Sequence, residues 1–136
     1  MTGIVVVSHS RPLAEAAVAL AQQMVRSGGP RLEIAAGTED GGLGTDAVAI
    51  SEAIGRAMDD QGVVVLMDLG SAIMSTETAL ELLDPADADR VRLSSAPFVE
   101  GLVGAVVTAA GGADPEAVAL EAETAPRAKR MQLGHE

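Results

Sequence analysis

The chain has 136 residues, 48% of them hydrophobic, and this length and composition suit one globular domain with a sizeable core. Its net charge of −11 and its single aromatic residue, Phe98, disfavour nucleic-acid binding, because a polyanion needs a cationic surface and bases need stacking partners. The absence of cysteine excludes disulfides and thiolate metal sites, and the lack of a long apolar run or signal-peptide pattern predicts a cytoplasmic protein that does not contact a membrane.

The first half of the chain predicts two strands, each followed by a helix. The continuous apolar run Ile4–Ser8 is typical of a strand buried on both faces. Apolar residues at helical spacing follow over 13–24, and Leu32–Ala36 is a second short strand. The Gly-rich connection 37–46 then leads into a helix over 47–57.

The second half repeats the alternation. Val63–Met67 is another fully apolar strand, and a helix is expected over 70–83. Val91–Ser94 predicts a weaker fourth strand. Two further helices follow, a very apolar one over 97–110 and a last one over 115–124.

This alternation predicts an α/β fold: a single doubly wound, mainly parallel four-stranded sheet with helices on both faces. The most economical strand order is 2-1-3-4, since the first crossover winds to one side of strand one and the chain then returns to its other side. No repeat or linker is visible, so residues 1–125 are expected to form one domain. The remaining residues, 126–136, are polar and basic and are expected to be a mobile tail.

Two polar residues end neighbouring strands of this predicted sheet. His9 follows the first strand directly, and Asp68 follows the third. Doubly wound sheets bind ligands at the carboxyl ends of their strands where the winding reverses, which here is between strands one and three. A carboxylate that accepts a hydrogen bond from Nδ1–H of an imidazole fixes its tautomer and leaves the Nε2 lone pair free to attack an electrophile.

Hydrogen-bond donors are expected around this pair. Ser10 begins the first helix, and Gly70 and Ser71 begin the third, so that N-terminal N–H groups and positive dipole ends point into the crevice. Thr45 and the glycines of 41–44 can close over it. Helix N-termini that converge on a nucleophilic imidazole suit a phosphoryl group.

Simpler interpretations of the same residues remain open. His9 could be a structural histidine, Asp68 a helix cap, and Ser8 a hydrogen-bonding residue at the strand end. The glycines at 41, 42 and 44 could form an ordinary flexible loop, and they are not a P-loop because no Gly-Lys-Ser/Thr follows them.

Other enzyme classes fit the residues less well. A Ser-His-Asp hydrolase is disfavoured because Ser8 and Ser10 are expected to point away from the ring of His9. A phospho-aspartate receiver domain needs a lysine late in the sheet, whereas Lys129 in the tail is the only lysine. A metal site lacks ligands, since the other histidine is His135, so no metal and no cofactor are expected.

Four segments together resemble the phosphotransferase subunits of bacterial dihydroxyacetone kinases, which are members of the mannose-type enzyme IIA superfamily of the phosphoenolpyruvate:sugar phosphotransferase system. The resemblance covers nearly all of residues 3–125. The segments read VVVSHS, GTEDGGLGTD, VVVLMDLGSA and SSAPFVEGLVGAVV.

The resemblance implies a phosphotransferase that works through a phosphohistidine. His9 would accept a phosphoryl group from the phosphocarrier protein HPr and pass it to ADP bound on the kinase subunit, while Asp68 orients the ring. Family members form homodimers, which suits the apolar helix 97–110. The other implied site residues border the phosphate: Gly41, Gly44, Thr45, Ser71 and the segment Pro97–Gly101.

Alternatives to the kinase subunit remain. A mannose-class sugar-transporter IIA domain would share the site, although "MDLGSA" and "LGTD" favour the kinase subunit. Some relatives carry fused HPr-like and enzyme-I-like domains, which we expect to be separate proteins here. "SHSRP" is also similar to a turn of small tetrapyrrole chelatases, which need a second histidine, and a regulatory module without turnover is a third class.

Overall fold

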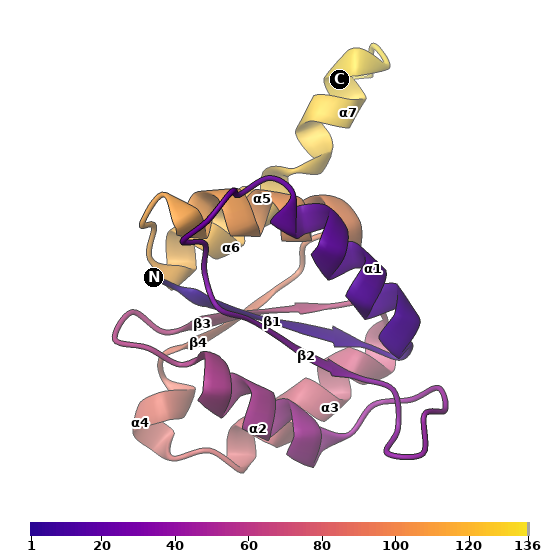
Figure 1. The fold of residues 1–136 in the computed structure, drawn as a ribbon, viewed down its shortest axis with the longest axis vertical. Coiled ribbons are helices and arrows are strands. Elements are labelled where there is room, and N and C mark those ends of the chain that lie inside the picture. The colour runs from indigo at the N-terminus through magenta and orange to yellow at the C-terminus, as the bar shows by residue number, and fades with distance from the viewer. Residues whose placement is uncertain (136) are drawn as a thin grey trace.

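A single parallel sheet forms the centre of the computed structural model, which describes residues 1–135. The strand order is β2-β1-β3-β4 with helices on both faces (Figure 1), which confirms the predicted fold class and topology. The strands are β1 (Gly3–Ser8), β2 (Leu32–Ala36), β3 (Val63–Met67) and β4 (Val91–Ser94).

Five helices lie where the apolar spacing predicts them. No helix within residues 1–135 has the length and apolarity to cross a bilayer. The five are α1 (Arg11–Gln22), α2 (Ala47–Ala57), α3 (Gly70–Glu81), α5 (Phe98–Ala110) and α6 (Pro115–Thr124).

Two short helices were not predicted. They are α4 (Pro85–Ala88) and α7 (Pro126–Gln132), and both begin at a proline, whose fixed φ suits the first helical position. Neither buries a residue, so neither leaves an apolar pattern in the sequence. The expected tail therefore contains a helix, which projects from the body in Figure 1 and contacts it through the ion pair of Lys129 with Glu100. The mobility of the tail stays a prediction.

The two sides of each central strand enter two separate cores. Side chains at alternate positions, such as Ile4 and Val6 of β1, pack with α1, α5 and α6. Val5 and Val7 face the other way and pack with α2 and α3. Because helices cover both faces of the sheet, all of β1 and β3 is buried, which explains their uninterrupted apolar sequences.

Side-chain caps set where two of the helices near the carboxyl edge of the sheet begin. Ser10 caps α1 by accepting a hydrogen bond from the Leu13 N–H. Asp46 caps α2 by accepting from the N–H groups of Val48 and Ala49, and Thr45 precedes it. The hydroxyl of Thr45 is thereby left for another contact.

Gly3 shows how tightly β1 is packed. A Cβ at this position would lie 2.1 Å from the carbonyl oxygen of Ala57, at the end of α2. We expect Gly3→Ala to lower the free energy of unfolding by about 1–3 kcal/mol, measured by urea denaturation, because the backbone must move to relieve the clash.

Gly55 provides the matched control, since it is exposed on α2 with nothing within 4 Å of an added Cβ. Gly55→Ala should stabilise the protein by about 0.5–1 kcal/mol through helix propensity. An equal loss of stability in both variants would show that the approach of Ala57 does not restrict Gly3.

Candidate active site

The topology brings His9 and Asp68 to one edge of the sheet. β1 and β3 are direct neighbours, with Val7 opposite Met67, so the residues that follow them emerge side by side. The backbone N–H of Asp68 donates to the carbonyl of Val7 at 3.1 Å and continues the ladder beyond β3. The predicted meeting of the two strand ends is therefore observed.

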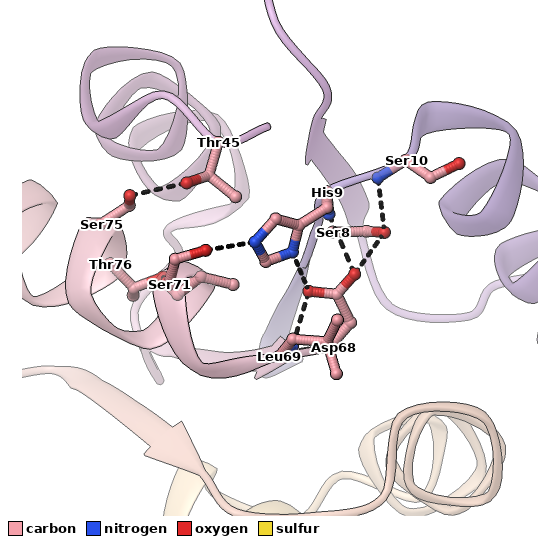
Figure 2. A network of polar contacts seen from close by, with 10 residues as sticks. Ser8, His9, Ser10, Thr45, Asp68, Leu69, Ser71, Ser75 and Thr76 are labelled. Atoms are coloured by element: carbon pink, nitrogen blue, oxygen red, sulfur yellow. Dashed lines mark hydrogen bonds and ion pairs between the residues drawn. The ribbon is translucent and has the colours of Figure 1, made fainter. Parts of the chain in front are cut away.

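The side chains of His9 and Asp68 are in direct contact. Nδ1 of His9 lies 2.8 Å from Oδ1 of Asp68 (Figure 2). The carboxylate is 8% exposed and the imidazole 25% exposed. The ring is thus accessible while the group that orients it is buried.

Asp68 accepts four hydrogen bonds, two at each oxygen. Oδ1 accepts from Nδ1–H of His9 and from the Leu69 N–H, and Oδ2 accepts from the His9 N–H and the Ser8 hydroxyl. Burial raises the pKa of Asp68, but these hydrogen bonds outweigh burial and hold the pKa below its ordinary value of 3.8. A carboxylate surrounded by donors on every side is ionised at neutral pH and cannot rotate freely.

The second ring nitrogen faces α3. Because the ionised carboxylate only accepts hydrogen bonds, Nδ1 carries the ring proton and Nε2 holds the lone pair. The hydroxyl of Ser71 contacts Nε2 and donates to it. This nitrogen therefore lies at the first turn of α3, where the positive end of the helix dipole favours negative charge.

The Gly-rich loop between β2 and α2 also reaches the site. The N–H of Gly44 donates to the carbonyl of His9 at 2.9 Å. The Thr45 hydroxyl lies 2.7 Å from the hydroxyl of Ser75, one turn along α3 from Ser71. Thr45 thus lies beside the site, but its hydroxyl is bonded to Ser75 rather than to the ring.

Other residues that the sequence singles out are engaged elsewhere. The Ser10 hydroxyl is used by the α1 cap, and Figure 2 shows it pointing away from the ring. The N–H of Gly41 donates to Thr38 within the loop. Gly70 is the first residue of α3, as expected. In the segment Pro97–Gly101, the Gly101 N–H closes the first turn of α5 and Glu100 binds Lys129.

The structure corrects the treatment of the serines. Ser8 and Ser10 do point away from the ring. Ser71, Asp68 and the imidazole between them nevertheless form a Ser-His-Asp chain of contacts, which was not predicted. The contacts of Ser8 with Asp68 and of Ser75 with Thr45 were not predicted either. The spacing of Ser71 and Ser75, four residues apart on a predicted helix, was the available signal for Ser75.

Metal-ligating side chains are not clustered in the described part of the chain. Among residues 1–135, no group of three or more histidine, cysteine, aspartate or glutamate side chains could hold an ion. His135, which a chelatase would need near His9, follows α7, where its N–H donates to the carbonyl of Arg130.

Comparison with known sequences identifies the family of this site. Residues 3–119 match the family described as EIIA-man, PTS system fructose IIA component. The chain belongs to the EIIA-man family. This membership confirms the resemblance that the four motifs indicated.

Similar EIIA-man proteins differ in length. The chain is 50% identical over 136 residues, which is 98% of this chain and 29% of the relative, to "PEP-dependent dihydroxyacetone kinase, phosphoryl donor subunit DhaM" of Escherichia coli strain K12. It is 37% identical to "PEP-dependent dihydroxyacetone kinase 2, phosphoryl donor subunit DhaM" of Listeria innocua, covering 89% of this chain and 96% of the relative. The chain thus spans less than a third of the length of the longer relatives. That HPr-like and enzyme-I-like domains are separate proteins here stays a prediction.

A solved structure supports the fold. A crystal structure of a protein of unknown function, EF1359, is 31% identical and superposes with a TM-score of 0.80, covering 90% of this chain and 93% of that one. The EIIA-man domain described above therefore has a close structural counterpart over almost its whole length.

The ionised state of Asp68 leads to a pH-dependent prediction. Asp68→Asn should lower the free energy of unfolding by about 1–3 kcal/mol at pH 7, because an amide cannot accept all the hydrogen bonds that the carboxylate accepts. The pKa of Asp68 is lowered in the folded protein, so its contribution is present above the unfolded value of 3.8 and is lost as pH falls through the folded pKa.

The measurement is urea unfolding of both proteins from pH 7 downward. The difference between wild type and Asp68→Asn should be constant down to about pH 4 and shrink below it. A difference that grows as the pH falls would contradict the assignment of Asp68 as a carboxylate stabilised by folding.

Proposed function

We propose that this EIIA-man domain carries a phosphoryl group on Nε2 of His9. It receives the group from HPr, which enzyme I charges from phosphoenolpyruvate, and passes it to ADP on the kinase subunit of a dihydroxyacetone kinase. The observation that carries the proposal is the contact of Nδ1 of His9 with the buried Asp68, which leaves Nε2 as the free acceptor on a ring that is partly exposed. The names of the similar proteins, phosphoryl donor subunits of such kinases, support the choice of acceptor.

In the first step, Nε2 of His9 attacks the phosphorus carried by HPr. The bond from phosphorus to the donor breaks, and its electron pair stays with the donor. Positive charge grows on the imidazole as the new N–P bond forms, and the buried Asp68 carboxylate at Nδ1 stabilises this charge. Once the lone pair is used, the Ser71 hydroxyl, which donates to Nε2 before the transfer, turns its hydrogen to a phosphoryl oxygen.

In the second step, an oxygen of the ADP β-phosphate attacks the same phosphorus. The N–P bond breaks, and its electron pair returns to Nε2. ATP is formed on the kinase subunit, where it phosphorylates dihydroxyacetone. Asp68 keeps the ring in one orientation through both steps, so the nitrogen that accepts the group also releases it.

A sugar-transporter role is the second candidate, because the matching family is described as the fructose IIA component of the phosphotransferase system. In that role the phosphohistidine would pass its group to a transporter domain instead of to ADP. The chemistry at His9 is the same in both roles, so only the acceptor distinguishes them.

A homodimer is also part of the proposal. Most apolar residues of α5 face the core, including Leu102 and Val106, but Val99 and Val107 are 39% and 50% exposed. Leu20 on the neighbouring α1 and Met24 in the turn that follows α1 are also exposed. These side chains give α1 and α5 an apolar outer surface that a second copy could cover.

The central prediction concerns the site of labelling. With labelled phosphoenolpyruvate, enzyme I and HPr, the wild type should acquire one acid-labile, base-stable phosphoryl group, and His9→Ala should acquire none. His135→Ala, which removes the other histidine, should label as the wild type does. Label that persists in His9→Ala, or no label in the wild type with an active donor system, would refute the carrier function.

The labelled protein then identifies the acceptor. We expect it to lose its label to ADP-loaded kinase subunit, with formation of labelled ATP. Transfer to a sugar-transporter IIB domain, with none to ADP, would assign the protein to the second candidate role.

Substitution of Ser71 distinguishes a carrier that is phosphorylated on His9 from an enzyme in which Ser71 is the nucleophile. Ser71→Ala should slow labelling by about 10- to 100-fold, because one hydrogen bond to a charged group is lost, but the label should still reach His9. Ser51→Ala is the control, since that hydroxyl only donates to a carbonyl of its own helix, on α2. Complete loss of label in Ser71→Ala would indicate that the serine is the nucleophile.

A further inference from the structure

Ser75 on α3 makes a contact that the chemistry at His9 does not require. Its hydroxyl lies 2.7 Å from that of Thr45, and both residues are half-buried. Ser75 follows Ser71 by four residues, so both hydroxyls project from the same face of α3. Figure 2 shows the Thr45–Ser75 pair on the side of the imidazole away from Asp68.

The two threonine hydroxyls of this helix behave differently. Thr76 donates to the carbonyl of Ala72 at 2.7 Å, and Thr78 donates to that of Met74 at 3.1 Å. Such bonds within the helix are the usual ones for serine and threonine. Ser75 instead joins α3 to a residue 30 positions away in the sequence.

This contact closes the Gly-rich loop against the site. Gly44 is bonded through its N–H to the carbonyl of His9, and Thr45, the next residue, is bonded to Ser75. The loop before them is largely exposed, with Leu43 80% exposed, and contains several glycines. Since little burial holds such a segment, its position beside His9 depends on a few hydrogen bonds.

We propose that Ser75 is a positioning residue for the phosphorylated state: by holding Thr45, it keeps the loop 37–46 closed beside Nε2 of His9. Ser75 does not touch the ring and acts through Thr45. The inference rests on the proposed function, because the closed loop matters when a phosphoryl group is on the ring. The loop then excludes water that would attack the phosphorus, break the N–P bond and release inorganic phosphate, with the electron pair returning to Nε2.

The contact itself can be tested without phosphorylation. In the full chain, Ser75→Ala and Thr45→Val should each increase amide hydrogen exchange at Gly44 by about 3- to 10-fold, the effect of one neutral hydrogen bond. The double variant should match the single ones, because all three lose the same bond. Thr78→Ala, on the same helix, should leave exchange at Gly44 unchanged. Unchanged exchange in Ser75→Ala would overturn the proposal.

The functional role needs a second measurement, the rate at which the labelled protein loses inorganic phosphate in the absence of an acceptor. Ser75→Ala should lose its label about 3- to 10-fold faster than the wild type, while Thr78→Ala should equal the wild type. Ser75→Thr, which keeps a hydroxyl, should restore the slow loss.

The outcomes distinguish this inference from the proposed function. Faster exchange at Gly44 with unchanged loss of label would confine Ser75 to a structural role and overturn its functional one. A wild type that takes no label would refute the carrier function, and the role of Ser75 in it, whatever the exchange result.

Discussion

The hydrogen bond from Nδ1 of His9 to Asp68 is the interaction on which the rest of the site depends. It sets which ring nitrogen carries the proton, and so which nitrogen is nucleophilic. It also sets the plane of the ring, which brings Nε2 to the hydroxyl of Ser71 at the start of α3. Without this bond the imidazole could turn and exchange its tautomer, and the donors around Nε2 would no longer face the reacting nitrogen.

The fold supplies this bond at little conformational cost. β1 and β3 pair directly in the middle of the sheet, and both are buried by helices on the two faces, so their ends are rigid. Three of the four donors to Asp68 come from Ser8, the last residue of β1, and His9, the residue after it, and the fourth is the N–H of Leu69. Two of these donors are backbone N–H groups and two are side-chain groups, so the ends of both strands hold the carboxylate in place. Because the site is preorganised in this way, it does not have to rearrange when charge develops on the ring.

The exposure of the pair is unequal, and this inequality matters for the chemistry. The carboxylate is buried, where its attraction to a positive ring is weakly screened, while the ring reaches the surface. A carrier has to meet two different partners at one atom, which a deep pocket would prevent. An imidazole that is 25% exposed over a carboxylate that is 8% exposed is compatible with the proposed carrier function.

Much of this arrangement follows from the sequence because it depends on strand order. The apolar runs Ile4–Ser8 and Val63–Met67 predict two buried strands, and the winding rule makes them neighbours, so His9 and Asp68 could be paired before any coordinates. Contacts that depend on side-chain rotamers could not be predicted in the same way. Ser71, expected to bind phosphate, contacts Nε2 itself, and Thr45 turns its hydroxyl to Ser75.

Helices α4 and α7 were not predicted for a related reason. Apolar periodicity reports which face of a segment is buried, and α4 and α7 bury none of their residues. Their starts are marked only by Pro85 and Pro126, which are equally consistent with turns. Likewise, Gly41 lies within the predicted site loop, but its N–H is used inside the loop, and residue type alone does not reveal such a local bond.

The most direct test of the account is nitrogen-resolved NMR of His9 in ¹⁵N-labelled protein, before and after phosphorylation by the phosphoenolpyruvate-dependent donor system. The account predicts a proton on Nδ1 and a bare Nε2 in the free protein, and phosphorus–nitrogen coupling at Nε2 in the charged one. A proton on Nε2 in the free protein, or phosphorus bonded to Nδ1, would contradict it.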